Sequence, residues 1–257
     1  MQSYEENGVP MERWRIGAST YETCLTRGAR LLRWRLSLPT GNREILHWPA
    51  AADFAPDKIG LVRGGNPILF PFMGRNYADG EKFAWKDAEG VKRPMPQHGF
   101  ARDCRFEIIE SSDRHALVRM VPDDRARACY PFAYEFRIRY EFRELFLRCT
   151  FEFENQDSHP LPWCAGHHFY FTLPWHAGLS RHDYLLKIGS KKQWRHAADG
   201  IDPHLLRKHR LPGLHRHRAR GLGRKELQVR GTRADRREGL GRREDDAIDA
   251  AEDEYRH

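Results

Sequence analysis

The sequence of 257 residues has little of what several protein classes require. Its five cysteines form an odd set without a Cys-x-x-Cys pair, so they indicate neither a disulfide framework nor a zinc ribbon, and we expect reduced thiols. No window approaches the roughly 18 apolar residues of a membrane span. The first residues also lack the basic and apolar regions of a secretion signal. These absences predict a cytoplasmic protein without a membrane partner.

Aromatic residues are missing from one end of the chain. Of 14 Phe, 7 Trp and 9 Tyr, only Tyr255 lies beyond Trp194. Residues 195–257 show neither strand alternation nor a sustained apolar helix face, and their few leucines could hardly offset the entropy lost on ordering. Two interpretations stay open. One is that the segment is a disordered tail. The other is that the reading frame shifts near residues 194–210, because shifted translation of a GC-rich gene yields an amino-acid sequence rich in Arg, Gly, Ala, His and Pro.

The net charge of +8 is unevenly placed. An Arg/His-rich run at 211–243 gives way to an acidic run at 244–254. The basic run lacks interleaved aromatics and any recognised nucleic-acid motif. We therefore expect no nucleic-acid partner.

The aromatic part of the chain has the pattern of β-strands. Over residues 132–142, bulky apolar side chains alternate with Ala, Glu and Arg, which predicts a strand with one buried face. The alternation changes parity over 145–153, with Arg143 and Glu144 as the tight turn of a hairpin. Similar or shorter runs recur at 30–38, 45–48, 67–72, 106–110 and 116–121. No helix of ordinary length stands out, so we predict an all-β protein, a large antiparallel β-sandwich.

Two segments, 64–102 and 166–175, combine charged or imidazole side chains with glycine, proline and aromatics. They contain Arg75, His98 and the adjacent pair His167 and His168. This mixture is typical of strand ends and tight loops around a polar ligand. It indicates a sugar site.

Three motifs in these segments closely resemble the aldose 1-epimerase family, which includes galactose mutarotases and hexose-6-phosphate epimerases. They are NPILFPFMGR at 66–75, HGFAR at 98–102 and GHHFYFTLPW at 166–175. The likeness covers residues 12–194, preceded by a flexible segment at 1–11 and followed by the tail at 195–257. It implies a galactose mutarotase-like supersandwich, incomplete at its C-terminus. It also implies an isomerase that needs no cofactor or metal and interconverts the α and β anomers of an aldohexose or hexose 6-phosphate.

The resemblance also implies roles for individual residues. In such a reaction a general acid protonates the ring oxygen while a base takes the proton of the C1 hydroxyl. His168 opens a His-x-Tyr-Phe pattern and is the expected acid, for which an unperturbed pKa of about 6.5 is suitable. Arg75 and His98 are the expected substrate-binding residues. His167 would point to the opposite face of an extended segment, and we expect it to be packed and hydrogen-bonded.

Purely structural roles are the alternatives for these positions. Arg75 could form an ion pair with Asp79 or Glu81, and His98 could be a turn histidine satisfied by the backbone. A zinc site of His98, His167 and His168 is disfavoured, because adjacent strand histidines diverge and no carboxylate sits at ligand spacing.

Five further residues have weaker claims. Arg102 could face a phosphate, but a strand-edge salt bridge is favoured. Trp85 and Trp175 could stack on a sugar ring, but core positions are favoured. Asn66 and Tyr170 are candidates for the wall of the site only.

The family's base is a glutamate near the C-terminus, and an aspartate of the later half binds sugar hydroxyls. This sequence loses the family pattern before either position. Glu226, Glu238 and Glu244 lie in a part of the sequence that does not resemble those strands, so neither role is assigned to a residue of this chain. The chain as written could therefore be inactive. The alternative function is a non-catalytic carbohydrate-binding protein, and the oligomeric state is not indicated.

Overall fold

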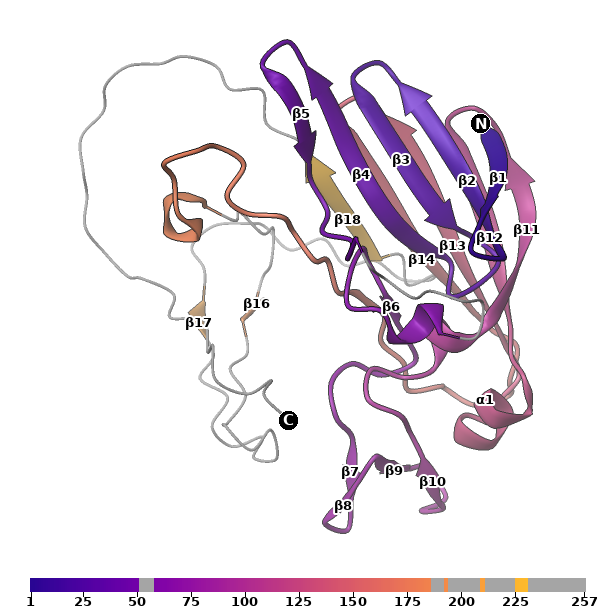
Figure 1. Cartoon of the computed structure of the whole chain (residues 1–257). Coiled ribbons are helices and arrows are strands. Elements are labelled where there is room, and N and C mark those ends of the chain that lie inside the picture. Colours follow the sequence, from indigo (N-terminus) through magenta and orange to yellow (C-terminus); the bar gives the residue numbers. More distant parts are fainter. Residues whose placement is uncertain (51–57, 186–191, 194–208, 211–224, 231–257) are drawn as a thin grey trace.

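The structure is a computed structural model that describes residues 1–50, 58–185, 192–193, 209–210 and 225–230. Within these residues, two five-stranded antiparallel sheets face each other (Figure 1). The first sheet runs in chain order through β1 (Gln2–Glu6), β2 (Val9–Ile16), β3 (Ser19–Cys24), β4 (Arg30–Leu38) and β5 (Gly41–Glu44). The second runs through β11 (Arg105–Ser111), β12 (His115–Val121), β13 (Tyr134–Arg143), β14 (Phe146–Asn155) and β18 (Lys225–Arg230).

Shorter elements connect the sheets or extend from them. The short strands are β6 (Ile68–Leu69), β7 (Tyr77–Ala78), β8 (Glu81–Lys82), β9 (Ala84–Lys86), β10 (Lys92–Pro94), β15 (Gly166–His167), β16 (Lys192–Gln193) and β17 (His209–Arg210). Among the described residues, three 3₁₀ turns span Ile59–Leu61, Ala101–Asp103 and Arg181–Asp183. The one α-helix in the described part of the chain is α1 (Asp124–Cys129), which the Asp123 side chain caps. None of the described helices is long and apolar enough to cross a membrane.

The predicted hairpin is present as β13 and β14. Phe142 pairs with Leu147 and Ile138 with Phe151, so the alternating apolar residues of both strands share the inner face. Arg143 pairs with Phe146, which makes residues 144 and 145 the turn. The predicted turn was therefore one residue too early, because Arg143 is polar yet still part of the ladder.

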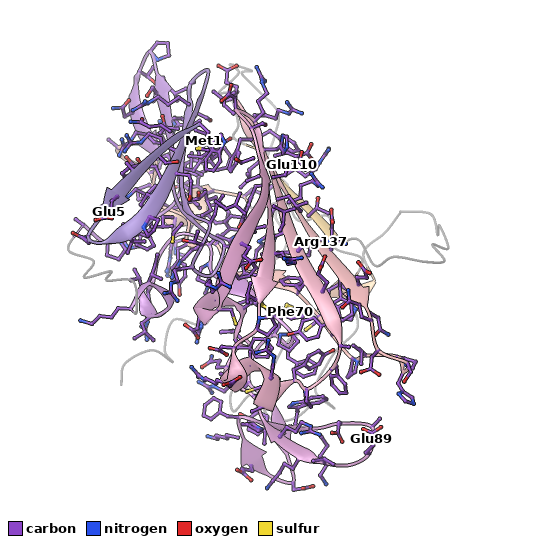
Figure 2. All side chains as sticks on the ribbon, turned by 90° about the vertical axis from the view of Figure 1, so that its right-hand side faces the viewer. Met1, Glu5, Phe70, Glu89, Glu110 and Arg137 are labelled. Atoms are coloured by element: carbon purple, nitrogen blue, oxygen red, sulfur yellow. The ribbon has the colours of Figure 1, made fainter. Side chains whose placement is uncertain are left out.

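The core lies between the two sheets, where side chains of both fill the space (Figure 2). Trp14 of β2 stacks on Phe142 of β13, with ring centroids 4.3 Å apart. Phe70, directly after β6, is fully buried and stacks on Phe136 at 3.9 Å. Phe70 thus anchors the segment that carries the candidate site in the aromatic core.

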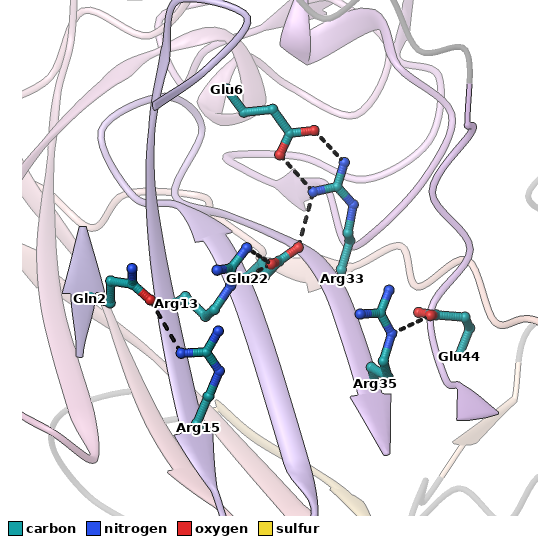
Figure 3. Close-up of polar contacts among 8 residues, drawn as sticks. All are labelled: Gln2, Glu6, Arg13, Arg15, Glu22, Arg33, Arg35 and Glu44. Atoms are coloured by element: carbon teal, nitrogen blue, oxygen red, sulfur yellow. Dashed lines mark hydrogen bonds and ion pairs between the residues drawn. The ribbon is translucent and has the colours of Figure 1, made fainter. Parts of the chain in front are cut away.

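The outer face of the first sheet carries ion pairs (Figure 3). Arg33 of β4 bonds both Glu6 of β1 and Glu22 of β3, and Arg13 of β2 also bonds Glu22. Burial would raise the pKa of Glu22, but the hydrogen bonds from Arg33 and Arg13 outweigh burial and lower it. These contacts join strands β1 to β4.

Residues 1–11, for which the sequence predicts a flexible segment, contain β1 and the start of β2 in the structure. Gln2–Glu6 pairs with β2 in register, and Val9 and Met11 are buried in a small cluster with Cys24, Leu32 and Ile59. Apolar residues are sparse and irregularly spaced in this stretch, so the strand signal is weak in the sequence. The predicted tail at 195–257 lies outside the described residues, apart from 209–210 and the β18 strand that pairs with β14.

Candidate functional site

The three motifs lie side by side around β6. On one side β6 pairs with β15, with Leu69 opposite Gly166 and Ile68 opposite His167. On the other side the Phe70 N–H donates to the carbonyl of His98 at 3.2 Å, and the Phe100 N–H donates back to Phe70 at 2.9 Å. A strand of two residues therefore brings together histidines that are about 70 positions apart in the chain.

The backbone at His98 and Gly99 is left-handed, with φ of +69° and +74°. A Cβ atom on Gly99 would lie 1.9 Å from the carbonyl oxygen of Phe70, so only glycine fits there. His98 is strained in this conformation. Two bonds with Gly74 hold it: the His98 N–H donates to the Gly74 carbonyl at 2.8 Å, and the Gly74 N–H donates to Nδ1 of His98 at 3.1 Å.

These contacts fix the chemistry of the His98 ring. Because Nδ1 accepts a hydrogen bond, the proton of the neutral ring is on Nε2, which lies 3.4 Å from the side-chain amide of Gln97. Burial, followed by the charges of His168, Arg102 and Arg75, lowers the pKa of His98 to about 4. At neutral pH His98 is thus an uncharged hydrogen-bond donor through Nε2.

His168 faces His98. The two ring centroids are 5.4 Å apart and the planes meet at 69°. The His168 ring is half-buried, lies 4.9 Å from the Tyr170 ring, and has no hydrogen-bond partner within the described ranges. Its ring nitrogens are therefore available to a ligand. The structure brings these two candidates together.

His167 points the other way, as its position in an extended segment predicts. Its ring stacks between Phe151 at 4.5 Å and Phe169 at 5.2 Å. Its Nδ1 lies 2.8 Å from the Asn66 amide nitrogen, and burial lowers the pKa of His167 to about 3. The prediction of a packed, hydrogen-bonded histidine is confirmed.

Arg75 follows Gly74 on the same loop and is exposed. The alternative ion pairs do not form, because Asp79 binds Lys86 at 2.7 Å and Glu81 binds Lys92. Across the described residues Arg75 has no carboxylate partner. Its charge acts on His98, so the guanidinium is part of the same electrostatic environment.

The weaker candidates have structural contacts. Trp85 is buried and its Nε1–H donates to the Cys129 carbonyl at 2.9 Å, which confirms a core position. Trp175 is half-buried, with Arg43 5.6 Å above its ring. Arg102 approaches its neighbour Asp103 at 3.7 Å, so it forms a salt bridge, within a 3₁₀ turn and not at the predicted strand edge. No group of three His, Cys, Asp or Glu side chains placed to hold a metal occurs among the residues that the structure describes.

The sequence predicted only a wall position for Asn66, but its contacts in the structure are more extensive. This side chain is fully buried; its Oδ1 accepts the His168 N–H at 3.0 Å, and its amide nitrogen contacts His167. Its own N–H donates to the carbonyl of Leu31 in β4 at 2.8 Å. An asparagine at the start of an apolar strand needs buried partners, which is the signal that could have identified it.

Solved structures define the class of fold. A galactose mutarotase-like protein from Clostridium acetobutylicum has a TM-score of 0.61 at 18% identity, over 82% of this chain and 65% of that one. One from Lactobacillus casei has a TM-score of 0.59 at 24% identity, over 85% and 67%. A galactose mutarotase related enzyme from Lactobacillus acidophilus has a TM-score of 0.54 at 22% identity, over 67% of this chain and 52% of its own. The fold is the mutarotase-like β-sandwich.

The sequence comparison names the family. The family model for aldose 1-epimerase matches residues 15–202. The chain belongs to the aldose 1-epimerase family. It spans only about half the length of the Lactobacillus acidophilus enzyme.

Proposed function

We propose that the chain is an aldose 1-epimerase that interconverts the α and β anomers of an aldohexose or hexose 6-phosphate. The observation that carries this proposal is the pairing of two unlike imidazoles. His98 is held neutral with its proton on Nε2, while the His168 ring, 5.4 Å away, has no partner in the described part of the chain. One ring can orient a sugar oxygen while the other transfers a proton to it.

The proposed reaction uses each residue differently. Protonated His168 gives its proton to the ring oxygen as the C1–oxygen bond breaks, and a base takes the proton of the C1 hydroxyl. The aldehyde then rotates and the ring recloses by the reverse transfers. Nε2–H of His98 donates to a ring or hydroxyl oxygen, and the guanidinium of Arg75 donates two bonds to adjacent hydroxyls or to a phosphate.

The base is not assigned. Glu238 and Glu244 lie outside the described residues, and the backbone of Glu226 in β18 lies opposite Thr150. A second candidate function, carbohydrate binding without turnover, is favoured by one observation. The described ionisable groups that shift the pKa of His98 are all cationic, so no described carboxylate acts on it.

Polarimetry or NMR exchange on fresh α-glucose, α-galactose and glucose 6-phosphate tests both candidate functions. The chain as written should be compared with His168→Asn and with a chain whose reading frame is corrected after the gene is sequenced across codons 190–215. We expect the corrected chain to equilibrate the anomers faster than buffer, and His168→Asn in the corrected chain to lose this acceleration. A corrected chain no faster than buffer overturns the epimerase, and sugar binding without turnover supports the second candidate.

A further inference from the structure

Asn66 joins three parts of the molecule at one buried point. Its backbone N–H donates to Leu31 in the first sheet, and its Oδ1 accepts the backbone N–H of His168. Its Nδ2 lies 2.8 Å from Nδ1 of His167. The side chain is fully buried, so water does not replace these partners.

The donors and acceptors of this cluster are determined. The amide oxygen of Asn66 is occupied by the His168 N–H, so the amide nitrogen faces His167 and donates. Nδ1 of His167 must then accept, which leaves the ring proton on Nε2. That Nε2 is buried without a hydrogen-bond partner among the described residues. The buried ring between Phe151 and Phe169 is therefore neutral and of one tautomer.

We propose that Asn66 is a positioning residue, which clamps the backbone of His168 and the ring of His167 so that the His168 imidazole is held facing His98. His167 and His168 point to opposite faces, so a fixed ring at one position sets the direction of the next side chain. The relevance to catalysis rests on the proposed function, but the clamp itself does not.

Histidine NMR on the full chain, with ¹⁵N-labelled imidazoles, tests the clamp without requiring turnover. In the unmodified chain His167 should show a bare Nδ1 and a protonated Nε2, unchanged from pH 7 to pH 5. Cross-relaxation between the His98 and His168 rings should be visible at this separation. A protonated Nδ1 on His167, or its titration near the usual pKa, would overturn the proposal even if every variant failed to fold.

Two substitutions separate the functions of the amide. In Asn66→Asp the carboxylate still accepts the His168 N–H but cannot donate, so the His167 proton should move to Nδ1. In Asn66→Ser both contacts are lost, the His168 amide should exchange at least about tenfold faster, and cross-relaxation between the His98 and His168 rings should weaken. Asn155→Asp is the matched control, because that amide donates to the His159 carbonyl in an exposed turn, and it should change none of these signals.

Turnover measurements provide a second test of the positioning role. In a chain that turns over sugar, Asn66→Ser should lower kcat about tenfold while sugar affinity changes less than about twofold, since the substrate-binding residues Arg75 and His98 are untouched. Unchanged ring–ring cross-relaxation in Asn66→Ser, or unchanged kcat, would refute the positioning role. A frame-corrected chain with the predicted His167 tautomer and no turnover would refute the proposed function alone.

Discussion

Replacing Gly99 with alanine should destabilise the protein strongly, because this glycine lets the His98 loop approach β6. The added methyl group would lie 1.9 Å from the carbonyl oxygen of Phe70, 2.3 Å from its carbonyl carbon and 2.8 Å from the nitrogen of Pro71. All three contacts are with backbone atoms, so no side-chain rotation relieves them. The loop or β6 must move.

The size of the effect has three contributions. A left-handed φ of +74° costs an alanine about 1–2 kcal/mol relative to the right-handed regions. Overpacking adds about 1–3 kcal/mol. Separation of the strands also weakens the bonds between Phe70, His98 and Phe100, each worth about 1 kcal/mol. We therefore expect Gly99→Ala to lower the free energy of unfolding by about 3 kcal/mol or more.

Gly80→Ala is the matched control. Gly80 has a φ of +77°, and a Cβ atom there would meet nothing within 4 Å. It should show the conformational contribution alone, about 1–2 kcal/mol. Urea denaturation followed by tryptophan fluorescence measures both variants. If the two lose the same free energy within about 0.5 kcal/mol, the close approach of His98 to β6 is not a constraint and the reasoning fails.

Two further predictions concern charge. The pKa of His98 is about 4 in the folded state and 6.5 in the unfolded chain, so the unfolded state takes up the proton first as the pH falls. The stability that this group contributes is therefore complete above pH 6.5 and is lost as the pH falls toward 4. The urea midpoint should fall over this range, less so in His98→Gln, and equal losses would contradict the prediction. Arg75→Ala should weaken sugar binding about tenfold in calorimetry, the range of a charged hydrogen bond, without changing the unfolding midpoint. Arg93→Ala, which removes the ion-pair partner of the buried Asp87, should lower that midpoint instead. Unchanged sugar affinity in Arg75→Ala would exclude Arg75 from the site.

The sequence predicts the β-sandwich well where one face of a strand is buried over many residues. In β13 and β14 the period of two sets both the inner face and the pairing, since a slip of one residue would expose Phe142 and Leu147. The turn position is less determined, because polarity does not separate Arg143, which is paired, from Glu144, which is not.

The site is less accessible to such reasoning. β6 and β15 have two residues each, which is too short for any periodic signal, yet they place His168 beside His98. That proximity came only from the family resemblance, and the roles of Arg75, His98 and His168 remain proposals. Asn66 was predicted only as a wall residue, because the groups that its side chain contacts are about 100 positions away along the chain.

The state of His98 limits where the second proton of the proposed reaction can go. Its Nδ1 is occupied by the Gly74 N–H, its Nε2 already carries a proton, and burial makes the ring a weak base. His98 therefore cannot accept the proton of the C1 hydroxyl while His168 donates to the ring oxygen. The base must be a further group that reaches the space between these two rings, and its supply is what separates an epimerase from a carbohydrate-binding protein in this chain.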